Sequence, residues 1–239
     1  MKALYLDVSS YQNSDAIDYK RIVEEGGVEG VIIKIGFTGY GTAKTKRIDS
    51  MFQKHYDGFH ATGVPIGVYW YSCAYSEQEA IEEAKKTLEF LGDRKLQLPI
   101  FFDTEDNHDV GNPLNHHLNQ RMLGADKLTK IVRAYCDHIL ANGYKVGVYS
   151  YVSWLNKQVH LDQLRDYIIW VAHYGVDKPS IEGYAMWQYT SDGRLPGYSD
   201  RLDLNWCYED LTNGVKEHLK TYSFKLLGFE IKVEVRWSK

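Results

Sequence analysis

Residues 98–106 read LPIFFDTED, an apolar run that leads directly into acidic residues. Five apolar or aromatic residues in succession are typical of a strand that is buried on both faces, as in a parallel sheet covered by helices. Asp103, Glu105 and Asp106 then stand at the carboxyl end of that strand. The stretch therefore predicts a parallel α/β fold with a cluster of carboxyl groups at one edge of its sheet.

Similar short apolar runs recur along the chain. Eight strands are predicted, at residues 3–8 (ALYLDV), 31–35 (VIIKI), 66–71 (IGVYWY), 99–103 (PIFFD), 146–151 (VGVYSY), 168–172 (IIWVA), 184–189 (YAMWQY) and near 202–204. Patterns of helical length lie between many of them, at residues 16–25, 49–62, 76–91 and 119–141. The third of these opens with Ser76 and Glu79, which form a capping-box pattern.

Strands that alternate with helices predict an α/β domain, and eight strands predict an irregular, TIM-like β/α barrel. The intervals between strands shorten after residue 145, so reduced helices are expected in the last crossovers. From Phe229 onward apolar and charged residues alternate (FEIKVEVRW), which is the period of a one-faced strand or hairpin. We therefore expect a barrel over residues 1–215. A short C-terminal β tail over 216–239 would be an appendage, a linker or a contact for a homo-oligomer.

The acids at the end of the fourth strand have the spacing of a catalytic pair. Asp103 and Glu105 are two residues apart, so in an extended chain they point to the same side, with carboxyl groups roughly 6–7 Å apart. Two carboxyl groups this close push each other's pKa values apart, and an apolar wall raises one of them further. One protonated and one ionised carboxyl group are what glycoside hydrolysis requires. The alternative is that the two acids cap the next element or bind a cation.

Two further acids occupy comparable places. Asp7 ends the first strand (LDVSSYQ) and Asp203 lies at the last one (DRLDLN). In a closed barrel the first and last strands are neighbours, and reactive groups gather at the carboxyl ends of the strands. We therefore expect Asp7, Asp103, Glu105 and Asp203 to converge at one mouth of the barrel.

The order of these segments resembles glycoside hydrolase family 25, the Chalaropsis-type lysozymes of bacteria and phages. The matching segments are LDVSSYQ, VIIKIGFTGYG, GVYWYS, PIFFDTE, GVYSYVSW, WVAHY and MWQYTSDGRLPGYSDRLDLN, in family order over about residues 3–206. The resemblance implies a distorted β/α barrel that hydrolyses the β-1,4 bond between N-acetylmuramic acid and N-acetylglucosamine in peptidoglycan. It assigns Glu105 as general acid, Asp103 as the second acid of a D-x-E motif, and Asp7 and Asp203 as the other acids of the cleft.

Aromatic and amide residues near the strand ends are candidates for binding the glycan strand. The chain has 19 Tyr and 6 Trp, and such amphipathic rings suit a wet groove for sugars. The predicted substrate-binding residues are Tyr69, Tyr71, Tyr149, Tyr174, Trp187, Gln188 and Lys34. The alternative for the aromatic residues is an apolar layer inside the barrel. Lys34 either meets a muramic acid carboxylate or pairs with one of the acids.

Composition and motifs exclude several other classes. The net charge of −4 provides no broad basic field for nucleic acid. No cofactor or metal is expected: the three cysteines are far apart, and His116 and His117 lack the spacing of a zinc site. No apolar run reaches transmembrane length, and the N-terminal MKALYLDVSS lacks a secretory leader. We expect action on the bacterial cell wall after holin-type release or after removal of a leader.

Two competing functions remain at this stage. A chitinase-like barrel requires a longer run of acids, and the positions of its first two are occupied by Leu98 and Phe101. A non-catalytic barrel module that binds peptidoglycan or another sugar is the alternative from a different class. The four acids argue against it, because a binding module does not need a protonated carboxyl group.

Overall fold

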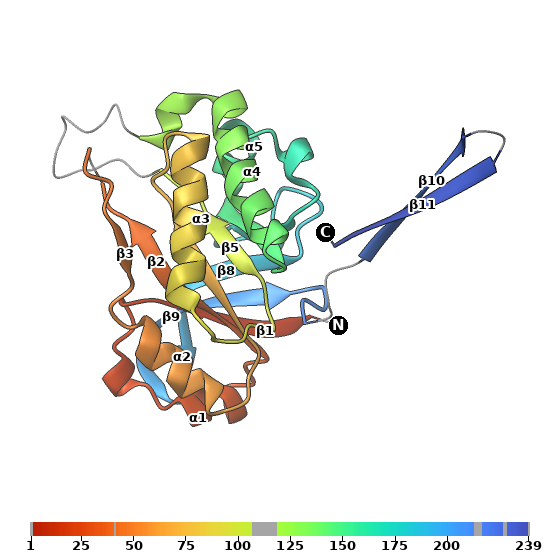
Figure 1. Ribbon diagram of the computed structural model, residues 1–239. Helices are drawn as coiled ribbons and strands as arrows, with labels where there is room; N and C mark the ends of the chain where they lie inside the picture. The colour runs from red at the N-terminus through yellow and green to blue at the C-terminus, as the bar shows by residue number, and fades with distance from the viewer. Residues whose placement is uncertain (1, 41, 107–118, 213–216, 227–228, 239) are drawn as a thin grey trace.

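A computed structural model describes residues 2–40, 42–106, 119–212, 217–226 and 229–238. His116 and His117 lie outside the described residues. The main sheet of the described chain has nine strands: β1 (Ala3–Val8), β2 (Gly30–Thr38), β3 (Lys46–Ile48), β4 (Ile66–Tyr71), β5 (Ile100–Asp103), β6 (Val146–Tyr151), β7 (Ile168–Ala172), β8 (Met186–Leu195) and β9 (Tyr198–Cys207). Pairing of β1 with both β2 and β9 closes all of these strands except β3 into a barrel (Figure 1). The prediction of a TIM-like barrel is confirmed.

The last strand departs from the parallel arrangement that the sequence predicts for the sheet as a whole. Strands β1, β2 and β4 to β8 run parallel, each to its neighbour. Strand β9 instead runs antiparallel to both β8 and β1. The physical reason is the short connection: β8 and β9 are joined by a tight turn at Gly197, whose φ is 93°, and a parallel return requires a crossover of a dozen or more residues.

Helices cover the first half of the barrel and diminish in the second half, as predicted. The helices are α1 (Tyr19–Glu24), α2 (Phe52–His60), α3 (Glu77–Leu91), α4 (Ala125–Ala141) and α5 (Val152–Lys157), with 3-10 turns η1 (Ser14–Ala16), η3 (Gln120–Leu123) and η4 (Leu161–Leu164). The predicted helix over 119–141 is divided into η3 and α4, because Gly124 has a φ of 74° that helical residues do not adopt. The connection from β7 to β8 contains no helix, although every residue in it is described.

The first turn of α3 confirms the capping pattern in a modified form. The Ser76 hydroxyl accepts the backbone N–H of Glu79. The Glu79 carboxylate reaches one residue further back than in the standard capping box and accepts the N–H of Tyr75. Both bonds satisfy backbone donors at the start of the helix, which fixes where α3 begins.

Side chains that alternate along the strands build two apolar clusters. One fills the space between the barrel and its helices, with members such as Ile33, Trp70 and Phe102. The other fills the barrel interior and includes Phe101 and Trp170, whose rings meet edge to face at 5.1 Å. Because neighbours along a strand face opposite ways, each interior position is predictable once one is known.

The tail forms a separate two-stranded antiparallel sheet. Strand β10 (Glu217–Leu226) pairs with β11 (Phe229–Ser238), and neither strand joins the barrel sheet (Figure 1). The predicted hairpin is therefore present. Across the described residues, no helix combines the length and the apolar character that a membrane span requires.

Candidate active site

The four predicted acids line one cavity of about 230 Å³ at a mouth of the barrel. Asp7 lies near the end of β1, Asp103 ends β5, and Glu105 follows two residues later. Asp203 is the register partner of Asp7 across the β1–β9 pair. Because β9 runs antiparallel, Asp203 reaches the mouth from the middle of its strand and not from a carboxyl end. The sequence thus predicted the convergence, although the geometry behind Asp203 was different.

Polar and aromatic side chains complete the wall of this cavity. Four of them were predicted: Tyr69, Tyr149, Tyr174 and Gln188. Three were not predicted: Ser9, Tyr11 and Trp170. Ser9 and Tyr11 follow Asp7 directly in LDVSSYQ, so their place in the chain could have indicated them. Trp170 is 1% exposed, and only the two-residue period of β7 could have shown that it faces the interior.

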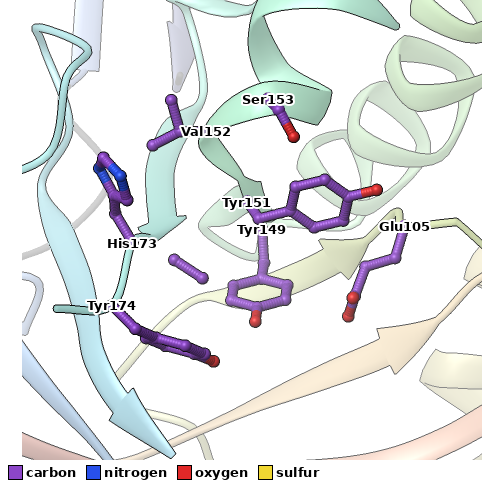
Figure 2. Close-up of a pocket in the computed structure, with 8 residues that line it drawn as sticks. Glu105, Tyr149, Tyr151, Val152, Ser153, His173 and Tyr174 are labelled. Carbon is purple, nitrogen blue, oxygen red and sulfur yellow. The ribbon is translucent and has the colours of Figure 1, made fainter.

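A second cavity, of about 400 Å³, adjoins the first. Figure 2 shows the residues that line it: Glu105, Tyr149, Tyr151, Val152, Ser153, Ala172, His173 and Tyr174. Glu105, Tyr149 and Tyr174 belong to both cavities. Glu105 therefore borders both cavities and stands where they meet.

Asp7 is held by two amide side chains. The Gln188 Nε2 group donates to Asp7 Oδ2 at 2.9 Å, and the Asn205 Nδ2 group donates to the same oxygen at 2.7 Å. Both donors favour the ionised carboxylate, whereas burial and the charge of Asp203 raise the pKa of Asp7 well above its ordinary value. Asn205 was not predicted; its two-residue spacing from Asp203 places it on the same face of β9.

The two amide groups are themselves held by hydrogen bonds from aromatic side chains. Gln188 Oε1 accepts the hydroxyl groups of Tyr149 at 2.8 Å and of Tyr174 at 2.5 Å. Asn205 Oδ1 accepts the indole N–H of Trp170 at 2.8 Å. These bonds leave only one orientation of each amide in which its N–H groups face Asp7. The network thus orders one side of the cavity before any ligand enters.

Burial raises the pKa of the other three acids. It raises that of Asp103 well above the ordinary value, with further contributions from the charge of Glu105 and from a hydrogen bond with Glu105. Burial also raises the pKa of Glu105, but that bond and the positive charge of Lys34 oppose the increase. Burial and Glu105 raise the pKa of Asp203 to about 6. Burial is the largest cause of the increase for both members of the pair, and Asp103 is the deeper of the two.

Lys34 was expected to end the second strand, but it lies within β2. Strand β2 continues to Thr38, with a bulge between Lys34 and Gly36 in its register with β4. The ammonium group lies 5.1 Å from the ring centroid of Tyr71 and 5.9 Å from that of Tyr69. No carboxylate of the described residues lies within ion-pair distance of it. Its charge nevertheless lowers the pKa values of Asp103 and Glu105 without a direct ion pair.

Two of the predicted substrate-binding residues, Trp187 and Tyr71, line neither cavity. Trp187 lies on the face of β8 opposite to Gln188, packs in the outer apolar cluster and donates its indole N–H to the His173 carbonyl oxygen at 2.8 Å. Strand alternation, which sends Gln188 inward, sends Trp187 outward. The Tyr71 hydroxyl shares a hydrogen bond of 3.2 Å with that of Tyr40, beside Lys34, and Tyr71 lines neither cavity.

Comparison with known families agrees with this geometry. The family profile described as "Glycosyl hydrolases family 25" matches residues 6–198. The chain belongs to glycoside hydrolase family 25. The prediction of a glycoside hydrolase of this family is therefore confirmed. Asp7, Asp103 and Glu105 lie within the matched residues, and Asp203 lies five residues beyond them.

Relatives of this family 25 chain include cell-wall enzymes. It is 27% identical over 208 residues to the "Autolytic lysozyme" of Clostridium acetobutylicum, covering 87% of this chain and 57% of that protein. The modular autolysin LytC of Streptococcus pneumoniae, solved with a synthetic peptidoglycan ligand, superposes with a TM-score of 0.74 at 28% identity, over 87% of this chain and 47% of LytC. The catalytic domain of endolysin ply40, from bacteriophage P40 of Listeria monocytogenes, superposes with a TM-score of 0.66 at 28% identity. The match covers 89% of this chain and 96% of that domain. The chain thus spans about half the length of the first two relatives.

Proposed function

We propose that this chain is a muramidase that hydrolyses the β-1,4 bond between N-acetylmuramic acid and N-acetylglucosamine in peptidoglycan, with Glu105 as general acid and base. The observation that carries the proposal is the place of Glu105 where two cavities meet, beside buried Asp103. A glycosidic bond has a sugar on each side, and a carboxyl group between two cavities can reach the oxygen that joins them. Family membership and the named ligand of LytC support the substrate.

Asp103 offers a buried acceptor that an entering sugar can use. Its Oδ1 atom has no hydrogen-bond partner among the described residues, although the side chain is only 3% exposed. A buried acceptor without a donor is costly, so binding a donor there stabilises the complex. Each sugar of the proposed substrate carries a 2-acetamido group with one N–H. We expect Asp103 to accept that N–H and to direct the acetamido oxygen at the anomeric carbon.

The same contact explains how Glu105 acquires a proton. A donor on Asp103 favours its ionised form, so the proton that the pair shares moves to Glu105. Glu105 then protonates the glycosidic oxygen while the C1–O bond breaks and the acetamido oxygen bonds to C1. Asp103 stabilises the oxazolinium ion that results. Water next attacks C1, the bond to the acetamido oxygen breaks, and Glu105 takes the proton back.

The other polar groups hold the sugars. Asp7 and Asp203 present carboxylate oxygens to sugar hydroxyl groups and keep the cleft negative near Glu105. Tyr149 and Tyr174 border both cavities, where a ring can stack on a sugar face and a hydroxyl can bond an acetamido group. An alternative chemical course remains, in which ionised Asp103 activates water directly with inversion at C1. The anomer released first would distinguish the two courses.

The test is digestion of purified peptidoglycan by the wild type and Glu105→Gln, with exposed Glu89→Gln as the matched control. Products are reduced with borohydride, and the reduced sugar is identified by mass spectrometry. We expect muramitol ends from the wild type and the control, and at least a thousandfold fewer from Glu105→Gln. Glucosaminitol ends would show a glucosaminidase instead. Sedimentation with the wall without any new ends would favour a binding module.

A further inference from the structure

The residues on either side of Glu105 are tied to a different segment of the chain. Thr104 precedes Glu105, is fully buried and faces away from the cavity, because strand alternation turns it opposite to Asp103. Asp106 follows Glu105. Thr104 and Asp106 are both bound by side chains of residues 119–121, at the start of η3. These three residues were not predicted as part of the site. Glu105 itself is left to face the two cavities.

Gln120 holds the residue before Glu105. Its side chain is fully buried, and its Oε1 atom accepts the Thr104 hydroxyl at 2.8 Å. The Thr104 hydroxyl also accepts the indole N–H of Trp154 at 3.2 Å. The backbone of Thr104 is fixed as well: its N–H donates to Tyr149 O at 3.1 Å, and its carbonyl oxygen accepts the Ser150 hydroxyl at 2.5 Å. Thr104 therefore has little freedom to move in any direction.

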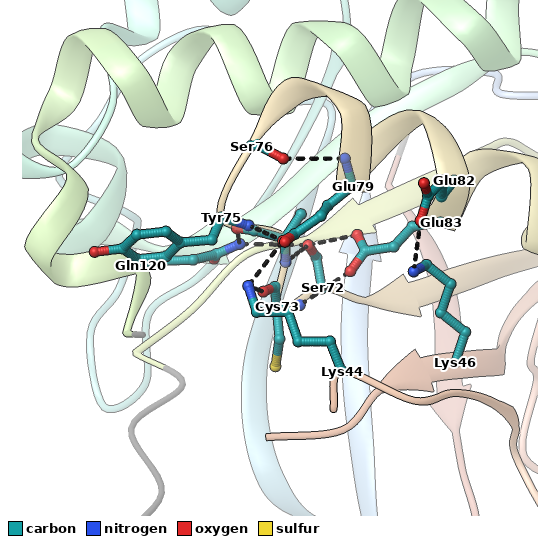
Figure 3. Close-up of polar contacts among 11 residues, drawn as sticks. Lys44, Lys46, Ser72, Cys73, Tyr75, Ser76, Glu79, Glu82, Glu83 and Gln120 are labelled. Atoms are coloured by element: carbon teal, nitrogen blue, oxygen red, sulfur yellow. Dashed lines mark hydrogen bonds and ion pairs between the residues drawn. The ribbon is translucent and has the colours of Figure 1, made fainter. Parts of the chain in front are cut away.

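The other end of Gln120 is anchored on the loop after β4 (Figure 3). Its Nε2 group donates to the Ala74 carbonyl oxygen at 2.9 Å and to the Ser72 hydroxyl oxygen at 3.3 Å. The Ser72 hydroxyl in turn donates to the fully buried Glu83 carboxylate of α3 at 2.6 Å. The Ser72 N–H also donates to the backbone oxygen of Asp103 at 2.9 Å. The anchor of Gln120 thus connects the acid pair to a helix.

Asn119 and Arg121 hold the residue after Glu105. The Asn119 Nδ2 group donates to Asp106 Oδ1 at 2.6 Å, and Arg121 forms an ion pair with Asp106 Oδ2. Asn119 Oδ1 accepts the backbone N–H of Arg121 at 2.9 Å, which orders the two side chains relative to each other. Both oxygens of the Asp106 carboxylate are therefore occupied.

We propose that residues 119–121 form a clamp that positions Glu105 for proton transfer by binding Thr104 and Asp106, with Gln120 as the main positioning residue. The proposal rests on the catalytic role of Glu105 given above. None of the three clamp residues lines either cavity. Gln120 therefore acts through Glu105 and not on the sugar, whereas Arg121 also hydrogen-bonds Tyr151 of the second cavity. A displacement of about 1 Å at a reacting group can reduce a rate by about a hundredfold, so a clamp of this kind acts on kcat.

The experiment compares Thr104→Val, Thr104→Ser, Gln120→Glu and Arg121→Ala with the wild type on soluble glycan fragments. Valine keeps the shape of Thr104 without the hydroxyl, and serine restores the hydroxyl. Glutamate keeps the acceptor of Gln120 but removes both Nε2 donors. The matched control is Thr87→Val in α3, where another buried threonine hydroxyl bonds Tyr135 at 2.8 Å, away from Glu105. Wild type and Glu105→Gln in the same assay show first whether the proposed function holds.

Thr104→Val, Gln120→Glu and Arg121→Ala are expected to lower kcat about 10- to 100-fold with KM changed less than about twofold. Thr104→Ser should recover most of the rate. Thr87→Val should lower Tm while kcat stays at the wild-type value. A wild-type kcat in folded Thr104→Val would overturn the proposal. So would equal losses in Thr104→Ser and Thr104→Val, or losses that follow only the unfolded fraction. If the wild type does not cleave, the proposed function fails before the clamp is tested.

Discussion

Replacing Asp203 by Asn should stabilise this protein above neutral pH and have much less effect in acid. The pKa of Asp203 is raised to about 6 from an ordinary 3.8, by burial and by the charge of Glu105. A folded pKa above the unfolded one means that the native state binds more protons, so the free energy of unfolding falls as pH rises from about 4 to about 6. A shift of about two units corresponds to about 3 kcal/mol, and partial exposure of the side chain reduces this to about 2 kcal/mol.

Asparagine removes that charge, and it also relieves Asp7, whose pKa the charge of Asp203 raises. The assay is urea unfolding of both proteins at pH 4 and pH 7. The stability difference between variant and wild type at pH 4 is subtracted from that at pH 7. This subtraction cancels the effect of lost contacts that do not depend on pH. We expect the stability of Asp203→Asn relative to the wild type to increase by about 2 kcal/mol between them, or about 4–8 °C in Tm.

Asp200→Asn is the control, since Asp200 is an exposed acid on the same strand. Its pKa is lowered by the backbone N–H of Arg201 and by Arg194, so its removal should not produce a gain that grows with pH. If Asp203→Asn changed stability equally at pH 4 and pH 7, or if both variants behaved alike, the account of a buried and mutually repelling acid cluster would be refuted.

Two further perturbations test the charge balance and the barrel packing. Lys34→Met should raise the pKa values of Asp103 and Glu105, because the Lys34 charge lowers both, and so move the alkaline limb of the kcat/KM pH profile to higher pH. Exposed Lys130→Met should leave the profile unchanged; an unmoved limb in Lys34→Met would contradict this electrostatic role. Gly147→Ala should destabilise the barrel by about 1–3 kcal/mol in urea unfolding, since overpacking of an interior has that cost. Its new Cβ would lie 2.4 Å from the Phe101 ring. In the control Gly39→Ala, the new Cβ would approach no atom closer than 3.6 Å. Equal stability of the two variants would argue against a tightly packed interior.

Much of the site was visible in LPIFFDTED because a strand and its end are local features. An apolar run predicts burial, and the two-residue period places Asp103 and Glu105 on one side, whatever the rest of the chain does. The same local logic did not predict Trp187 correctly. It lies in a segment that contributes to the site, and only the inward position of Gln188 shows that Trp187 faces the other way.

Other features depended on contacts between distant segments. The bulge between Lys34 and Gly36 forms where β2 pairs with β4, and the bond between Gln120 and Thr104 joins residues 16 apart without any repeat or motif to indicate it. The sequence also predicted that one acid of the pair would be protonated. Burial is the largest cause of the raised pKa of both acids, and depth is a property of the packed barrel.

The sequence by itself determined the barrel, its diminishing helices, the four acids that meet at its mouth and the hairpin at its end. Those properties follow from periodicity and residue type, which act over a few residues. Only the tertiary structure decided that β9 closes the barrel in the antiparallel direction, that Asp103 is the deeper acid of the pair and that residues 119–121 bind both neighbours of Glu105. These depend on distances and burial across the fold, because electrostatic and hydrogen-bond energies are set by which groups meet in space.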